Sequence, residues 1–117
     1  MWTRFMDMHS GGGLKEKWQF IYVEAPQAEA EVIFYNRFGH NPNRITCSCC
    51  GEDYSVSESE TLEQATDFDR NDETFGRGGM DVEKYKEEKD VLVIPKGEIK
   101  EEERHGELPQ QGWVWVS

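Results

Sequence analysis

Hydrophobic and polar residues follow several short regular patterns that predict a sheet and one main helix. Residues 18–23 are mostly aromatic and β-branched, which is typical of a strand buried on both faces. Trp18, Phe20 and Tyr22 would share one face, and Ile21 and Val23 the other. We therefore expect a central strand at residues 18–23.

The main helix is expected over about residues 26–38. Apolar residues recur there at three- and four-residue steps from Ala30 to Phe38, which is the spacing of one helix face. Pro26 suits the first turn, and Gly39 can adopt the left-handed conformation that ends a helix.

A hairpin is predicted over about residues 44–56, with a cysteine-containing turn at its tip. Thr61 with Gln64 three positions later has the form of a capping box. A short helix through Leu62, Ala65 and Phe68 would follow it.

The last third of the chain alternates polar tracts with apolar segments. A flexible acidic loop is expected at about residues 69–80, and a charged helix around 81–89. Residues 91–94 predict a buried strand and residues 113–116 a final one, separated by a solvated charged tract at about 96–109.

The chain of 117 residues has the length of one domain, so we predict a single domain over residues 1–117. Strands mixed with helices in this order predict an α+β fold with a mixed or antiparallel sheet. There is no run of about 18 apolar residues that would span a membrane, and the first residues lack the apolar core of a secretory signal. A reduced, cytosolic setting is therefore expected.

Charge is distributed unevenly along the chain. The formal net charge is −11, and residues 1–50 contribute none of it because their five acids balance five bases. Residues 51–117 hold nineteen acids and eight bases. Such a surface disfavours direct binding to nucleic acid and favours a protein partner with a basic surface.

The acidic residues suggest where such a partner would bind. Ordinarily, acidic runs form a solvated surface and nothing more. The alternative is that carboxylates held on a folded domain imitate nucleic-acid phosphates, with an exposed aromatic residue as an apolar anchor. The candidate contact residues are Asp67, Asp69, Asp72, Glu73, Glu101, Glu102 and Glu103.

A metal site is predicted at the cysteine cluster. Cys47, Cys49 and Cys50 are the only cysteines, and His40 precedes them closely, so thiolates and an imidazole could hold one zinc ion, with His9 as a reserve ligand. The chain lacks the second CxxC pair of a standard zinc ribbon, and partly buried free thiols are the alternative. A bound zinc would have a structural role, although a small zinc- or thiol-dependent enzyme at the same residues remains the competing hypothesis.

Four sequence motifs also carry a resemblance. The segments MWTRFMDMHSGGG (1–13), FGHNP (38–42), CSCCG (47–51) and GWVWV (112–116) resemble a family of small uncharacterised proteins of tailed bacteriophages. The resemblance implies a non-virion accessory protein in the cytoplasm of the infected bacterial host. Such proteins commonly bind and inhibit a host or defence protein, including CRISPR effectors, and a minor structural phage protein is the alternative.

Overall fold

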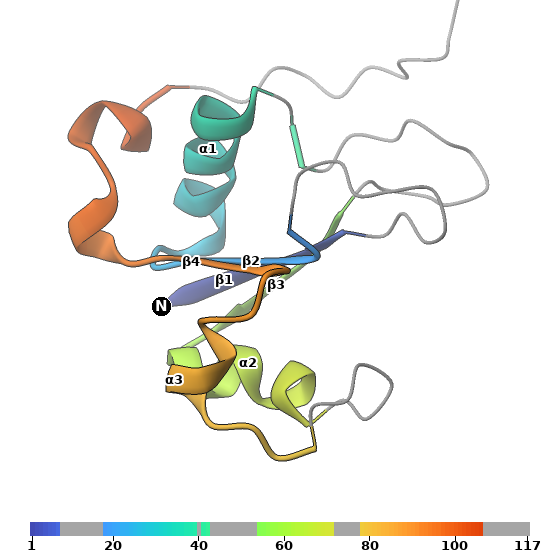
Figure 1. The fold of residues 1–117 in the computed structure, drawn as a ribbon. Coiled ribbons are helices and arrows are strands. Elements are labelled where there is room, and N and C mark those ends of the chain that lie inside the picture. Colours follow the sequence, from blue (N-terminus) through green and yellow to red (C-terminus); the bar gives the residue numbers. More distant parts are fainter. Residues whose placement is uncertain (8–17, 40, 43–53, 72–77, 107–117) are drawn as a thin grey trace, which may run out of the picture.

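The computed structural model describes residues 1–7, 18–39, 41–42, 54–71 and 78–106 and shows one four-stranded mixed sheet between two layers of helices (Figure 1). In spatial order the strands are β3 (Tyr54–Ser59), β1 (Trp2–Asp7), β2 (Phe20–Val23) and β4 (Val91–Ile94). β1 pairs antiparallel with β2 and β3, whereas β2 and β4 are parallel. The predicted α+β class with a mixed sheet is confirmed.

β2 lies inside the sheet, and all four of its residues are buried. Phe20 and Tyr22 face the layer of α2 and α3, while the two aliphatic residues face α1. The strand begins at Phe20 rather than at Trp18. Trp18 therefore does not share their face and packs instead against Phe38 on the α1 side, with 6.0 Å between ring centroids.

The helix α1 (Gln27–Phe38) begins directly after Pro26, as predicted. Its first backbone N–H, at Gln27, donates to a carboxylate oxygen of Glu58 on β3 at 2.7 Å, which satisfies a group that has no partner within the helix. Gly39 ends the helix with φ of 82°, and its N–H donates to the Tyr35 carbonyl at 2.8 Å. Glycine suits this position because a Cβ disfavours positive φ.

α1 covers one face of the sheet with the larger of two apolar clusters. The ring of Phe34 lies 4.8 Å from the rings of Phe5 and Phe38 and 4.9 Å from that of Tyr54, measured between centroids. These contacts join α1 to strands β1 and β3.

The opposite face of the sheet is covered by α2 (Leu62–Arg70) and α3 (Val82–Tyr85). Thr61 caps α2, because its hydroxyl accepts a hydrogen bond from the Gln64 N–H at 3.2 Å. The Gln64 side chain accepts from Glu60 rather than from Thr61, so only half of the predicted capping box forms. α2 extends to Arg70, two residues into the predicted loop, and α3 is shorter than the predicted charged helix because the chain turns after Tyr85 toward β4.

The predicted solvated tract at residues 96–109 is not wholly solvated. Residues 96–104 form two short 3₁₀ helices, η2 (Lys96–Glu98) and η3 (Glu101–Arg104), and Ile99 between them is buried in the α1 cluster. η3 is bound to α1 by ion pairs of Arg37 with Glu103 at 2.9 Å and of Arg104 with Glu29 at 2.6 Å.

Candidate protein-interaction surface

The predicted metal ligands lie outside the described residues. These ligands are His40, Cys47, Cys49 and Cys50, with His9 in reserve, and the tip of the predicted hairpin lies outside the described ranges with them. Within the described ranges, no group of three or more histidine, cysteine, aspartate or glutamate side chains is placed to hold a metal ion. Zinc binding therefore stays a prediction from the sequence.

The seven candidate contact acids do not form one surface. Asp67 and Asp69 lie on α2, whereas Glu101, Glu102 and Glu103 lie on η3, across the sheet from α2 (Figure 1). Asp72 and Glu73 lie outside the described residues. The two groups must therefore be considered as separate surfaces.

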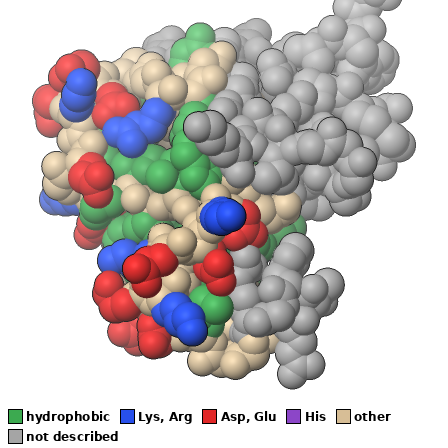
Figure 2. Space-filling view, in the orientation of Figure 1, with side chains coloured by type: hydrophobic (Ala, Val, Ile, Leu, Met, Phe, Trp, Pro, Cys, Tyr) green, Lys and Arg blue, Asp and Glu red, His purple; other side chains and the backbone are tan. Residues whose placement is uncertain are grey.

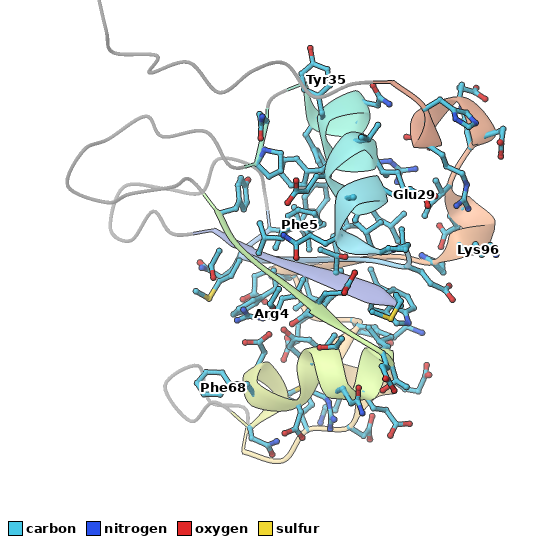
Figure 3. The ribbon with its side chains drawn as sticks, turned by 180° about the vertical axis from the view of Figure 1, so that it is seen from behind. Arg4, Phe5, Glu29, Tyr35, Phe68 and Lys96 are labelled. Atoms are coloured by element: carbon cyan, nitrogen blue, oxygen red, sulfur yellow. The ribbon has the colours of Figure 1, made fainter. Side chains whose placement is uncertain are left out.

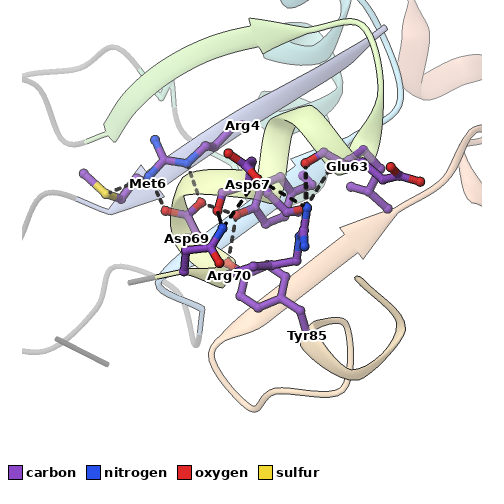
Figure 4. A network of polar contacts seen from close by, with 11 residues as sticks. Arg4, Met6, Glu63, Asp67, Asp69, Arg70 and Tyr85 are labelled. Atoms are coloured by element: carbon purple, nitrogen blue, oxygen red, sulfur yellow. Dashed lines mark hydrogen bonds and ion pairs between the residues drawn. The ribbon is translucent and has the colours of Figure 1, made fainter. Parts of the chain in front are cut away.

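Asp69 is a buried residue, which corrects its assignment as a contact acid. Its side chain is 1% exposed and forms a two-bond ion pair with Arg4 of β1, through Nε to Oδ2 at 2.7 Å and Nη2 to Oδ1 at 2.8 Å (Figure 4). The Tyr22 hydroxyl donates to the same carboxylate and lies 2.8 Å from the Tyr85 hydroxyl. We call Arg4, Tyr22, Asp69 and Tyr85 the buried polar network.

The buried polar network shifts the pKa of two of its groups, Tyr22 and Arg4. Burial raises the pKa of Tyr22 above its ordinary value, and the neighbouring Tyr85 and Asp69 raise it further. Burial acts to lower the pKa of Arg4, but the hydrogen bond to Asp69, the charge of Asp69 and the contact with Tyr22 together outweigh it, so the Arg4 pKa is raised. At neutral pH the network thus contains a charged Arg4 and a neutral Tyr22.

A different group of acids is exposed over α2 and α3. We define the acidic face as Glu63 and Asp67 of α2, Glu83 of α3, Asp81 at the start of α3, and Phe68. Figure 2 shows acidic side chains gathered over this part of the molecule. A groove of about 450 Å³ runs through the acidic face and is lined by Glu63, Arg70, Asp81, Val82 and Glu83.

The cation in this groove is already engaged by the protein. The Arg70 guanidinium donates to the Thr66 hydroxyl at 2.9 Å and to the backbone carbonyls of Met80 and Glu63 at 3.0 and 3.1 Å. Its hydrogen bonds do not go to the carboxylates of Glu63 or Glu83. Within the described part of the chain the Glu63 carboxylate forms no ion pair, so it is available to an external cation.

Phe68 follows Asp67 on α2 and is 76% exposed. Figure 3 shows its ring projecting outward at the C-terminal end of α2. The helix turns Ala65, Thr66 and Asp69 toward the interior instead. Phe68 is therefore exposed directly after Asp67, which is 72% exposed. A large apolar group in water is a typical anchor for a protein partner.

The acids of η3 are less available. Glu103 is bound to Arg37, whose hydrogen bond lowers the pKa of the Glu103 carboxyl. A hydrogen bond from His105 lowers the pKa of Glu101 in the same way. Glu101 and Glu102 remain exposed, but the described residues of η3 place no exposed aromatic residue beside them.

Comparisons with protein-family models, with curated proteins and with solved structures found no match for this chain. Among the helices in the described ranges, none is both long enough and apolar enough to cross a membrane. The surface itself is therefore the basis for a functional proposal.

Proposed function

We propose that this protein binds a basic surface of another protein through the acidic face and thereby inhibits it. The observation that carries the proposal is the exposed Phe68 next to the exposed Asp67 on α2, the helix whose Glu63 lines the acidic groove with Asp81 and Glu83. Carboxylates attract a basic partner over a distance, and an aromatic side chain supplies the close apolar contact that affinity requires.

The kind of partner follows from this charge. A net charge of −11 repels nucleic acid and suits a groove that ordinarily binds phosphates. The proposed target is a nucleic-acid-handling protein of a bacterial host or of an anti-phage defence system, such as a CRISPR effector. The resemblance to phage accessory proteins supports this setting, and the role requires no catalytic residues.

The first test compares three tagged proteins as baits in lysates of infected and uninfected host cells. One is the wild type, and one carries Glu63→Gln, Asp67→Asn, Phe68→Ala and Glu83→Gln. The third is a control with Glu98→Gln, Glu101→Gln and Glu102→Gln, which removes the same number of charges near η3. Asp81 is kept because its carboxylate accepts the Lys84 N–H at 2.8 Å and caps α3.

We expect the wild type and the control to retain one stoichiometric partner that the acidic-face variant binds at least 10-fold more weakly. Excess duplex DNA should displace that partner, and the wild-type protein should inhibit its activity. Binding lost in the control but kept in the acidic-face variant would place the interface at η3 instead. A partner that DNA leaves bound would exclude phosphate mimicry, and the absence of any enriched partner would contradict the proposal.

A further inference from the structure

The two faces of the sheet are covered by unequal amounts of apolar surface. Among the residues that the structure describes, the cluster under α1 contains ten buried residues and the cluster under α2 and α3 contains five. Ring centroids are 4.8 to 4.9 Å apart around Phe34 but 5.9 and 6.5 Å apart around Tyr85. Because apolar burial is the main stabilising contribution, the α2 and α3 layer is bound more weakly.

α2 contacts the sheet through few apolar groups. It buries Ala65, Thr66 and Asp69, of which only Ala65 is apolar, and the partly buried Leu62 packs against the same cluster. The Thr66 hydroxyl donates to the Leu62 carbonyl at 2.8 Å within the same helix. Asp69 is therefore the residue of α2 whose hydrogen bonds reach the sheet, at Arg4 and Tyr22.

The ion pair of Arg4 and Asp69 joins α2 to the sheet, and we call it the latch. When α2 separates from the sheet, both charges regain hydration, so the intact pair opposes this separation less than apolar contacts of the same size would. When Asp69 is removed in the closed state, the Arg4 guanidinium, whose side chain is only 15% exposed, is left without its carboxylate partner, which is costly.

α2 and α3 are also joined to each other. The Met80 N–H donates to the Arg70 carbonyl at 3.1 Å, and the Arg70 side chain donates to the Met80 carbonyl at 3.0 Å. These two bonds hold the segment that leads into α3 against the end of α2. The two helices would therefore move as one body.

We infer that α2 and α3 form a cover that opens from the sheet as a unit while α1 and the sheet stay folded, with Arg4 and Asp69 as its latch. The inference concerns the free protein and does not depend on the proposed partner. Opening would expose the side chains of Phe20, Tyr22 and Tyr85, which are buried when the cover is closed. The intact α1 cluster would hold the strands together meanwhile.

Native-state hydrogen exchange tests this inference on the full chain at increasing, sub-denaturing urea concentrations. In the wild type, we expect the amides of α2 and α3 to exchange faster than those of α1 and with a weaker dependence on urea, because their opening exposes less surface. Ile33→Val shortens a fully buried side chain of α1 and should raise exchange in α1 by about 2- to 10-fold. The exchange rates of the α2 and α3 amides should not change, because Ile33 stays packed both when these helices are closed on the sheet and when they are open.

The latch is tested with Asp69→Asn, which should raise exchange in α2 and α3 on the order of 100-fold. Its control is Asp67→Asn, the same change on the exposed side of the same helix, with an expected effect below about 3-fold. Equal responses of α1 and α2 to Ile33→Val would show one cooperative unit and overturn the cover. An unchanged exchange rate in Asp69→Asn would overturn the latch.

Discussion

Tyr22 of β2 and Tyr85 of α3 lie with their hydroxyl groups 2.8 Å apart between the sheet and the helices, and the Tyr22 hydroxyl also donates to Asp69. Their rings meet edge to face at 5.9 Å. At the scale of single residues, this arrangement makes the protonated phenol of Tyr22 part of the native structure, because its ionised form would face the Asp69 carboxylate.

Alkaline pH should therefore destabilise the protein through Tyr22. Its pKa is raised in the folded state, so its contribution to stability is complete below the pKa of unfolded tyrosine, about 10, and is lost as the pH rises above that value. From pH 9 to pH 11 the free energy of unfolding should fall by about 1.4 kcal/mol more in the wild type than in Tyr22→Phe, with most of the fall above pH 10. Urea unfolding at pH 9, 10 and 11 measures this, and parallel pH profiles for the two proteins would contradict it.

The sequence could not indicate that Asp69 is buried. Asp69 lies in the run Asp67-Phe68-Asp69, where two acids flank an aromatic residue, and local polarity predicts that the acids are exposed and the ring is buried. The structure shows the reverse for Phe68 and Asp69, because Arg4 on β1 supplies a partner 65 positions away. A pairing over that distance leaves no local pattern.

At the scale of elements, α1 was fully predictable, because its apolar spacing, its initial proline and its final glycine all indicate the same helix. β1 was not predicted. Its residues Trp2–Asp7 include Arg4, which faces the α2 side while Phe5 faces α1 (Figure 3). A charged residue on a buried face breaks the apolar alternation by which such a strand is recognised.

The contact between η3 and α1 should weaken at acid pH, because it includes the Glu103 carboxylate. The pKa of this carboxyl is lowered by its hydrogen bond from Arg37, so its contribution is present above about 4.5 and is lost as the pH falls below it. Because the pair is partly exposed, Glu103→Gln should cost about 1 kcal/mol of unfolding free energy at pH 7 and close to nothing at pH 3.

Urea unfolding at both pH values measures this difference. Glu102→Gln is the matched control, since the exposed Glu102 neighbours Glu103 on η3. A cost for Glu103→Gln that is equal at pH 7 and pH 3 would refute an electrostatic contribution to the docking.

At the scale of the whole molecule, the sequence predicted the acidic character but not the surface that carries it. Charge is countable from the residues alone, whereas the division of the acids between α2 and η3 depends on how the chain crosses the sheet. Glu63 and Glu83 were not among the candidates, because they come together only through the contact of α2 with α3.

The predicted zinc site is a further property that concerns the whole molecule. We expect about one zinc ion per chain by metal analysis of protein purified without chelators, and loss of that zinc in Cys47→Ala/Cys50→Ala. A chelator should lower the melting temperature of the wild type, because a structural metal contributes to folding. Ser48→Ala is the control within the same turn, and metal-free wild-type protein of unchanged stability would refute the prediction.

The parallel pairing of β2 with β4 constrains how the chain can fold during synthesis. Phe20 pairs with Val91, and Val23 with Ile94, so β2 is synthesised about 70 residues before its partner β4. Until Ile94 has left the ribosome, β2 has hydrogen-bonding groups and apolar side chains without their final partners, and such intermediates are prone to aggregate. Folding should accordingly complete only after synthesis of most of the chain, and translation arrested before β4 should yield a product that depends on chaperones.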